Sequence, residues 1–534
     1  MQLSFLGALH EVTGSCSYLE VNGRKLLIDY GMEQGKDFFV NQPIPVPAME
    51  LDAVLLTHAH IDHSGLLPLL NKQGFTGKVH ATIPTCNLCD IMLRDSAHIQ
   101  EFEAEWRNRK AQRGGREPYE PLYTMAHAQA LIKQFEPHEY DERRTLFDGI
   151  DVRFTDAGHL LGSACIELWL REGDVEKKLV FSGDLGNINQ PLLQDPCYVE
   201  QADYVLIEST YGDRAHEVTP DFAKALAAIL QRTFDRGGDV IIPSFAVGRT
   251  QELLYFMRHI KDEALVQGHG DFIVYVDSPL ANAATRVFTQ NARFCLDAEA
   301  KKLLSEGINP IAFSNLIATE TADESKLINV DKRRKVIISA SGMCEAGRIK
   351  HHLKHHLWDA KCSVVFVGYQ AVGSLGRSLL DGVKSVKLFD EKVRVAAEIV
   401  QLPGISGHAD VNKLIDWVTH IQPKPQHVFV NHGESDVSDG FSQRLNEEFG
   451  LTSSAPYSGS VFDLGNNAYI TLAPPVATQK AQKAAEEPTP AYKRLLAALE
   501  RLTALVKKFP GRANREVDTL TRALDALADG WERM

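Results

Sequence analysis

Short hydrophobic runs, each followed by a polar or glycine-containing loop and then a helical pattern, recur along most of this chain. The runs cover residues 25–28, 54–57, 179–183, 205–207, 240–244, 336–339 and 428–431. Buried strands that alternate with helices predict an α/β fold built in layers. Ligands of such sheets bind beyond the carboxyl ends of the strands. Because potential metal ligands are concentrated directly after several of these runs, we expect a functional site at that edge.

The pattern changes near residue 475. Residues 476–490 are rich in Ala, Lys, Gln and Glu between proline-containing ends, which predicts a linker. Beyond it, two amphipathic helices joined at Pro510-Gly511 predict a helical hairpin over residues 491–534. Its hydrophobic positions are Leu495, Leu499, Leu502, Val506 and Phe509, then Val517, Leu520, Leu524, Leu527 and Trp531. We expect this hairpin to dock on the body of the protein or to form a homodimer, with a specific partner or an RNA contact as the alternative.

The length and composition are those of a globular protein. With 534 residues, the chain is long enough for two or three domains. No hydrophobic run approaches the roughly 20 residues that span a bilayer, and residues 1–7 are typical of a first strand, not of a secretion signal. Only Cys86 and Cys89 form a C-x-x-C pair, which we interpret as thiols without a ligand role in a reducing cytoplasm. The net charge of −13 argues against indiscriminate nucleic-acid binding.

A dense group of metal-binding side chains follows the run at 54–57. His58, His60, Asp62 and His63 lie within six consecutive residues. Three imidazoles and one carboxylate suit a borderline metal such as zinc. Four polar groups beside a buried strand need partners, because burying them unpaired is costly. The motif therefore predicts a metal-dependent hydrolase.

The order His-x-His-x-Asp-His resembles the signature of the metallo-β-lactamase superfamily. Further residues of that signature follow predicted strands at His159, Asp184 and His432. The resemblance implies two zinc ions per chain, with manganese as an alternative. The implied ligands are His58, His60 and His159 for one ion and Asp62, His63 and His432 for the other, with Asp184 as the bridge. Asp29 resembles the acid of the family that orients a ligating histidine without binding metal.

The chain between Asp184 and His432 is much longer than a minimal domain of this superfamily needs. It resembles the β-CASP domain of RNA- and DNA-cleaving members. Residues 207–212 resemble motif A with Glu208, residues 406–410 resemble motif B with His408, and residues 431–434 resemble motif C. A histidine at motif C accompanies RNA-cleaving members, whereas DNA-repair members carry valine there. The resemblance covers residues 1–475 and points to bacterial and archaeal relatives of the pre-mRNA 3′-end cleavage endonuclease.

This resemblance implies a domain organisation and an activity. The αββα sandwich would comprise residues 1–210 and 395–475, and the inserted α/β β-CASP domain residues 211–394. The implied enzyme is a cytoplasmic ribonuclease of RNA processing or decay, which hydrolyses single-stranded RNA to 5′-phosphate and 3′-hydroxyl ends. Asp62 belongs to the implied catalytic set, with His408 as the general acid and Glu208 as the carboxylate that keeps His408 charged.

Two strand-to-helix turns add candidate phosphate contacts. The candidates are Ser244 and Arg249 in the first turn and Ser341, Gly342, Met343 and Arg348 in the second. Backbone N–H groups at helix starts attract anions, and arginine binds phosphate bidentately. Ordinary turn chemistry is the alternative explanation. The basic run at 348–356 is expected to be a solvated helix face or an RNA contact, with another metal site at its four histidines as the alternative. The basic stretch at 107–116 is expected to be an exposed loop or helix end.

Other functions compete with this interpretation. A thioester or lactone hydrolase of the same superfamily would have no evident use for the inserted domain. A DNA nuclease is separated from the RNA interpretation mainly by His432. A catalytically silent RNA-binding scaffold would have lost metal ligands, whereas every expected ligand is present. Endonucleolytic and 5′-exonucleolytic action are both compatible with these residues.

Overall fold

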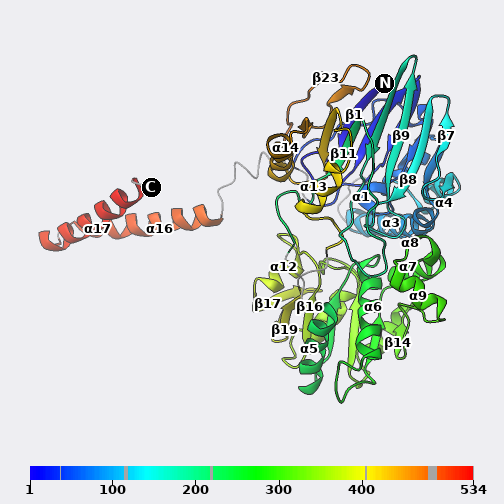
Figure 1. Ribbon diagram of the computed structural model, residues 1–534. Helices are drawn as coiled ribbons and strands as arrows, with labels where there is room; N and C mark the ends of the chain where they lie inside the picture. The colour runs from blue at the N-terminus through cyan, green and yellow to red at the C-terminus, as the bar shows by residue number, and fades with distance from the viewer. Residues whose placement is uncertain are drawn as a thin grey trace. The chain divides into compact units, whose positions relative to one another are not determined.

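The computed structural model describes residues 1–35, 38–112, 118–216, 221–402, 406–478, 490–510 and 512–532. These residues form two compact units. The first unit contains the described residues up to Pro475 apart from 38–40. The second contains residues 38–40 and everything described from Val476 onward. In Figure 1 the first unit carries the labels β1 to β23, and the second carries the labels α16 and α17.

Two mixed sheets form one half of the first unit (Figure 1). The first sheet has the order β23-β22-β1-β2-β3-β4-β5-β6. Its strands are β1 (Gln2–Gly7), β2 (Cys16–Val21), β3 (Arg24–Ile28), β4 (Ala53–Leu55), β5 (Lys78–Thr82), β6 (Phe135–His138), β22 (Val461–Asp463) and β23 (Ala468–Thr471). The second sheet has the order β21-β20-β11-β10-β9-β8-β7. Its strands are β7 (Arg144–Phe147), β8 (Ile150–Asp156), β9 (Ala164–Glu172), β10 (Val175–Phe181), β11 (Tyr204–Glu208), β20 (His427–Asn431) and β21 (Ser453–Ser454).

The two sheets pack face to face because their strands present hydrophobic residues at alternate positions. In β9, Ile166 and Leu168 lie in the core between the sheets together with Phe5 and Leu26 of the first sheet. Cys165, which directly precedes Ile166, belongs to the core on the opposite face. Helices cover both outer faces, which completes the αββα layering expected from the sequence. They are α2 (Leu67–Lys72), α3 (Ile83–Gln112) and α4 (Met125–Ile132) on the first sheet, and α13 (Val411–Thr419) and α14 (Ser435–Phe449) on the second.

The inserted domain forms the other half of the first unit around a six-stranded sheet of order β14-β13-β15-β12-β16-β19. The strands are β12 (Val240–Pro243), β13 (Ile273–Val276), β14 (Leu316–Ala318), β15 (Lys335–Ser339), β16 (Ser363–Phe366) and β19 (Glu398–Gln401). Every neighbouring pair is parallel, so the carboxyl ends of all six strands meet at one edge. Strand β19 lies beyond the boundary at residue 394 that we expected from the sequence, and it pairs with β16 of this sheet.

Helices flank the parallel sheet, as an inserted α/β domain requires. They are α5 (Phe222–Asp235), α6 (Arg249–Asp262), α7 (Pro279–Gln290), α8 (Ala292–Cys295), α9 (Ala298–Ser305), α10 (Ala322–Ile328), α11 (Ile349–His356) and α12 (Leu375–Leu380). A separate hairpin of β17 (Ser385–Leu388) and β18 (Glu391–Arg394) precedes β19. The mixed α/β fold with an inserted domain is therefore confirmed.

Direct contacts hold the inserted domain against the sandwich. The Asn87 side chain of α3 donates a hydrogen bond of 2.9 Å to the Asn291 side chain, which follows α7. Near the strand ends, a Cβ atom built on Gly248 would lie 3.3 Å from a methyl carbon of Leu160. Because Leu160 follows His159, the loop that leads from β12 into α6 lies next to the metal-ligand candidates.

The basic helix α11 is less exposed than we expected. His352 and His356 are buried, because a helix that places Ile349, His352, Leu353 and His356 on one face packs that face into the domain core. The Nε2 atom of His352 lies 2.6 Å from Asp277, a fully buried carboxylate at the end of β13. The expectation of a solvated histidine face was therefore wrong for these two residues, whereas His351 stacks on the half-exposed Phe389.

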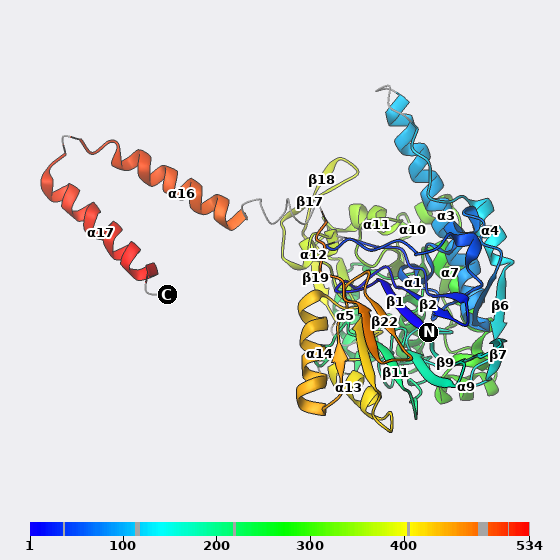
Figure 2. The ribbon, with the colours of Figure 1, turned by 90° about the horizontal axis from the view of Figure 1, so that it is seen from above.

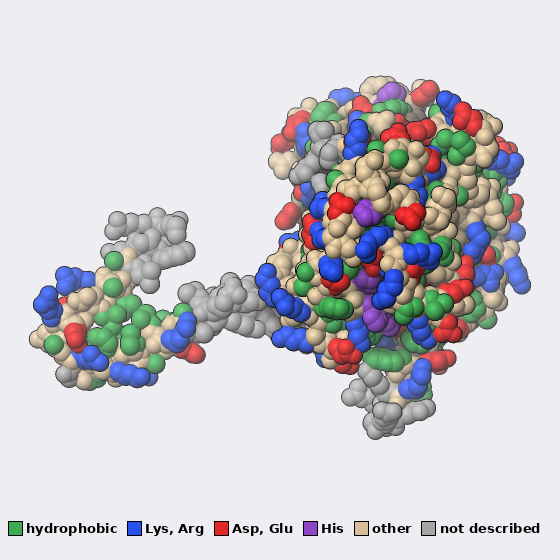
Figure 3. Space-filling view, turned by 90° about the horizontal axis from the view of Figure 1, so that it is seen from below, with side chains coloured by type: hydrophobic (Ala, Val, Ile, Leu, Met, Phe, Trp, Pro, Cys, Tyr) green, Lys and Arg blue, Asp and Glu red, His purple; other side chains and the backbone are tan. Residues whose placement is uncertain are grey.

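Two other sequence features take clear positions. Cys86 and Cys89 lie in α3 as free thiols. Arg107 and Arg109 lie in the exposed C-terminal part of the same helix. Arg113 and Arg116 fall outside the described residues. Figure 2 shows this part of α3 projecting away from the sheets of the first unit. On the face shown in Figure 3, Lys and Arg side chains lie among Asp and Glu side chains. Among the described residues, no helix is long and apolar enough to cross a membrane.

The second unit contains two helices, α16 (Pro490–Val506) and α17 (Asn514–Glu532), in the region where a hairpin was expected. Its hydrophobic side chains are poorly covered: Leu499 is 57% exposed, Val506 43% and Val517 37%. Most of the expected linker falls outside the described residues. The helical periodicity of this segment is therefore realised, while part of its hydrophobic seam remains exposed.

Candidate metal centre

Four strand ends at one edge of the sandwich carry the metal-ligand candidates. His58 and His60 follow β4, Asp62 and His63 lie in α1 (Ile61–Ser64), and His159, Asp184 and His432 follow β8, β10 and β20. Backbone hydrogen bonds hold the first of these loops in place. Ser15 N–H donates to the carbonyl of Asp62 and Tyr30 N–H donates to the carbonyl of His63, both over 2.8 Å. A Cβ atom on Gly31 would lie 1.6 Å from the Asp62 carbonyl oxygen, so only glycine permits this approach.

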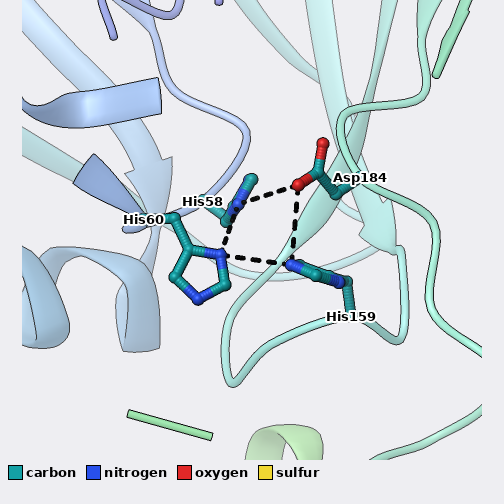
Figure 4. Close-up of side chains that lie close together, drawn as sticks. All are labelled: His58, His60, His159 and Asp184. Atoms are coloured by element: carbon teal, nitrogen blue, oxygen red, sulfur yellow. Dashed lines mark hydrogen bonds and ion pairs between the residues drawn. The ribbon is translucent and has the colours of Figure 1, made fainter. Parts of the chain in front are cut away.

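Three imidazoles and one carboxylate oxygen converge in the first group (Figure 4). The Nδ1 atom of His60 lies 3.1 Å from Nε2 of His58 and 3.1 Å from Nε2 of His159. Asp184 Oδ2 lies 3.5 Å from Nε2 of His58 and 3.6 Å from Nε2 of His159. Donor atoms at these separations, all within reach of one point, are arranged as the ligands of a metal ion are.

A second group lies on the other side of Asp184. The Nε2 atoms of His63 and His432 are 3.1 Å apart, and the Nε2 atom of His432 lies 3.6 Å from Asp62 Oδ2. Asp184 Oδ1 lies 3.3 Å from Nε2 of His63 and 3.6 Å from Nε2 of His432. The two oxygens of this one carboxylate therefore face different groups, which is the position expected of a bridging ligand.

The outer ring nitrogens of these histidines have partners that leave the inner nitrogens free for a metal. His159 donates from Nδ1 to the carbonyl of Gly407 over 2.8 Å, and His432 Nδ1 lies 3.2 Å from the Thr210 hydroxyl. His63 Nδ1 lies 2.7 Å from Asp29. An imidazole that donates from one nitrogen presents the lone pair of the other. The hydrogen bonds thus select the tautomers that metal binding requires.

Charge and burial agree with this assignment for the three histidines of the first group and for Asp184. Burial lowers the pKa of His58, His60 and His159, so these rings are neutral, which is the form that binds metal. Burial opposes the charged form of Asp184, but His432 and the other nearby histidines hold the pKa of that carboxyl well below its usual range. Its Oδ1 atom accepts no hydrogen bond from any described residue. This donor set fits divalent ions of the zinc type.

Glu208 and His408 form a pair beside the two groups. The Nδ1 atom of His408 lies 3.1 and 3.2 Å from the two carboxylate oxygens of Glu208 and 4.0 Å from Asp184 Oδ2. Glu208 is fully buried and also accepts a hydrogen bond of 2.7 Å from Leu185 N–H, so its position is fixed. Although burial opposes the charged imidazole, the Glu208 carboxylate raises the pKa of His408 to about 9. The His408 side chain remains 22% exposed and can reach a ligand.

The first candidate phosphate-binding turn, with Ser244 and Arg249, lies at the carboxyl end of β12, but these side chains already have partners within the protein. Ser244 is buried, and its hydroxyl contacts Thr250 over 3.1 Å. The guanidinium of Arg249 forms an ion pair with the buried Glu252. Phe245, between these residues, is 49% exposed. The turn therefore leaves the Phe245 ring, more than its charged groups, accessible to a ligand.

The second candidate phosphate-binding turn, which contains Ser341 and Arg348, forms hydrogen bonds with neighbouring segments. Hydrogen bonds between the Ser341 hydroxyl and the Ala346 backbone close this loop. A third turn, which the sequence did not mark as a candidate, binds the loop through Gln370 and Gly376. Gln370 donates to the carbonyl of Gly342 over 3.1 Å, and Gly376 N–H donates to the carbonyl of Met343 over 3.1 Å. Arg348 donates to Asp277 and to the Glu320 carbonyl, both over 2.7 Å. Contact of these residues with phosphate stays a prediction.

Several polar residues of the site escaped the sequence analysis. Thr57 and Thr210 contact ligand histidines, and Asp277 accepts four side-chain hydrogen bonds from the residues Thr319, Ser325, Arg348 and His352. Each of the three stands at or near the carboxyl end of a strand. A polar residue that ends a hydrophobic run is thus the signal in the sequence that marks all three.

Comparison with known proteins adds independent findings. Residues 11–244 match the family model of the metallo-beta-lactamase superfamily, residues 250–379 that of the Beta-Casp domain, and residues 392–456 that of the Zn-dependent metallo-hydrolase RNA specificity domain. "Ribonuclease TTHA0252" of Thermus thermophilus is 36% identical over 441 residues, which cover 82% of this chain and 94% of that protein. The "RNase J-like protein" of Methanocaldococcus jannaschii is 30% identical over 467 residues, which cover 86% and 99%. "Transcription termination factor FttA" of the same organism is 30% identical over 461 residues, which cover 84% and 69%.

Proposed function

Since the chain belongs to the β-CASP family of the metallo-β-lactamase superfamily and is a metal-dependent hydrolase, we propose that it is a ribonuclease with two zinc ions. The proposed products carry 5′-phosphate and 3′-hydroxyl ends. The observation that carries the proposal is the Glu208–His408 pair beside two groups of metal ligands. The relatives named as ribonucleases, and the match of residues 392–456 to an RNA specificity domain that includes His408 and His432, support RNA as the substrate.

The ligand groups divide between two ions in this proposal. His58, His60 and His159 would hold one ion, Asp62, His63 and His432 the other, and Asp184 would contact both through its two oxygens. When bound, such ions lower the pKa of water and offset negative charge on a phosphate. Manganese is an alternative to zinc, because carboxylate-containing sites also accept it.

His408 supplies the proton that the leaving group needs. Hydrolysis forms a bond between a water oxygen and phosphorus and breaks the bond between phosphorus and the 3′ oxygen of the ribose, which then requires a proton. Because Nδ1 of His408 contacts Glu208, its Nε2 is the nitrogen left to donate that proton. The charged ring persists at neutral pH because its pKa is raised to about 9, against the effect of burial, by the carboxylate of Glu208.

Labelled oligonucleotides test the substrate directly. The metal-loaded protein is incubated with single-stranded RNA and DNA of matched sequence, labelled at the 5′ end. We expect RNA to be cleaved at least tenfold faster than DNA, because histidine occupies position 432. The labelled products distinguish the mode: early release of the mononucleotide indicates 5′-exonuclease action, and internal fragments indicate endonuclease action. DNA cleavage at the same rate would favour the DNA nuclease, and no cleavage of either with hydrolysis of a thioester or lactone would contradict the proposal.

A homodimer through the C-terminal hairpin is part of the proposal. Its support is the exposure of Leu499, Val506 and Val517, since exposed hydrophobic stripes on paired helices mark association surfaces. A variant that ends at Pro475 should be a monomer by light scattering, while the full chain should have twice the mass of one chain. Equal monomeric masses for both proteins would rule out this role. RNA cleavage per active site should differ by less than about threefold, because every metal-ligand candidate precedes residue 475.

A further inference from the structure

We propose that Thr57 is a positioning residue, through which one buried carboxylate, Asp29, orients ligands of both metal groups. Asp29 contacts His63 of the second group directly and reaches His58 of the first group only through the Thr57 hydroxyl. This inference rests on the proposed function in so far as it assumes two occupied metal sites. It concerns the affinity of each site, which can be measured without RNA.

The direct connection runs from His63 to Asp29. The Nε2 atom of His63 faces His432 and Asp184, so its proton must reside on Nδ1 when the ring binds metal. That Nδ1 atom lies 2.7 Å from Asp29 Oδ2, and both side chains are buried. The hydrogen bond therefore fixes the ring and increases the electron density that its Nε2 presents to a metal.

The indirect connection runs from His58 through Thr57. The Nε2 atom of His58 faces His60 and Asp184, so its Nδ1 also carries the proton. This Nδ1 atom lies 3.1 Å from the Thr57 hydroxyl oxygen, which must then accept the hydrogen bond. The Thr57 hydroxyl in turn lies 3.0 and 2.9 Å from the two oxygens of Asp29, to which it donates its single hydrogen. The reverse arrangement would place a proton on Nε2 and prevent His58 from binding metal.

Packing gives the Thr57 side chain one orientation. A Cβ atom built on Gly183 would lie 2.9 Å from Cβ and 3.2 Å from the methyl carbon of Thr57, so the methyl group lies against the residue before Asp184. With the methyl group placed there, the hydroxyl points toward Asp29 and His58. Backbone N–H of Thr57 also donates to Asp29 Oδ1 over 2.8 Å.

Burial prevents solvent from replacing the Thr57 hydroxyl as a hydrogen-bond partner. Thr57 is 1% exposed, Asp29 2% and His58 fully buried. The remaining side-chain donor to Asp29 is Ser15, at 3.1 Å, on the Oδ2 side that His63 also uses. Removal of the hydroxyl would leave His58 Nδ1 without its acceptor. His63 Nδ1, which lies 3.3 Å from the same hydroxyl, would keep its shorter contact of 2.7 Å to Asp29. The loss should therefore fall on the first metal group.

The test compares Thr57→Ala with Thr57→Ser, because both lack the methyl group and differ only in the hydroxyl. Each is combined with His432→Ala, which disables the second group, or with His60→Ala, which disables the first. Zinc affinity is measured by competition with a chromogenic chelator in the metal-stripped full chain, with circular dichroism as the check of folding. With His432→Ala, the alanine variant should bind zinc about 10–100-fold more weakly than the serine variant. With His60→Ala, the two should agree within about threefold.

Asp29→Asn provides the second half of the test. It should weaken zinc binding in both backgrounds, because an asparagine keeps one uncharged acceptor oxygen where the two oxygens of Asp29 contact both His63 and the Thr57 hydroxyl. Equal losses for Thr57→Ala in the two backgrounds, or no difference between alanine and serine with His432→Ala, would overturn the inference. The proposed function is tested separately by the zinc content of the unmodified chain and by its RNA cleavage, so either can fail alone.

Discussion

Replacement of Asp184 by asparagine is expected to remove at least one of the two metal ions and to lower RNA cleavage on the order of 10³-fold or more. Each carboxylate oxygen of Asp184 faces a different ligand group, at 3.3 to 3.6 Å from the nearest imidazole nitrogens. An amide keeps one oxygen but turns N–H protons toward the other group, and it carries no charge. Metal content by elemental analysis and cleavage of labelled RNA are the two measurements.

Asp156→Asn is the matched control for this substitution. Asp156 is also a buried aspartate at a strand end, it precedes His159 by three residues, and burial raises its pKa to about 7. Its Oδ1 atom accepts a hydrogen bond from Gly158 N–H, which an asparagine oxygen can also accept. This control should keep both ions and activity within a few-fold of the unmodified chain. Two ions retained in Asp184→Asn with unchanged cleavage would show that Asp184 is not the bridging ligand.

The grouping of the metal-ligand candidates is the part of the site that the sequence predicted most completely. His58, His60, Asp62 and His63 are close in the chain, so their proximity in space needed no knowledge of the fold. His159, Asp184 and His432 are distant in sequence, and only their resemblance to a known signature connected them. The structure brings all seven into two groups, because four strand ends meet at one edge of the sandwich.

What surrounds the ligands depends on packing, which the linear pattern does not show. Thr57 is one residue from His58, yet its role follows from the contact between its methyl group and Gly183, far along the chain. Arg348 lies in a strand-to-helix turn, where the sequence predicts a phosphate contact, but the structure pairs it with Asp277. The burial of His352 also could not be predicted from the sequence, since it depends on which face of α11 meets the sheet. In each case a contact between distant segments decides the role of a polar side chain.

His408→Ala should lower RNA cleavage by about 10²–10⁴-fold while both metal ions remain. The reason is that His408 contacts Glu208 and does not belong to either of the two ligand groups assigned to the ions, although it lies 4.0 Å from Asp184. Loss of a metal ion together with activity would make His408 a ligand instead of a proton donor. His269→Ala is the control, because His269 precedes β13, at the opposite edge of the inserted sheet, and pairs with Asp235. It should leave cleavage within about twofold.

Glu208→Gln tests the role of the His408 proton through the pH dependence of RNA cleavage. Burial opposes the charged form of His408, and the Glu208 carboxylate raises the pKa to about 9. Without that carboxylate the pKa falls, so the ring loses its proton at lower pH. Cleavage by Glu208→Gln should therefore decline on the alkaline side at a lower pH than cleavage by the unmodified chain, with metal content unchanged. Profiles that decline at the same pH in both proteins would show that the His408 proton is not the one transferred to the leaving 3′ oxygen.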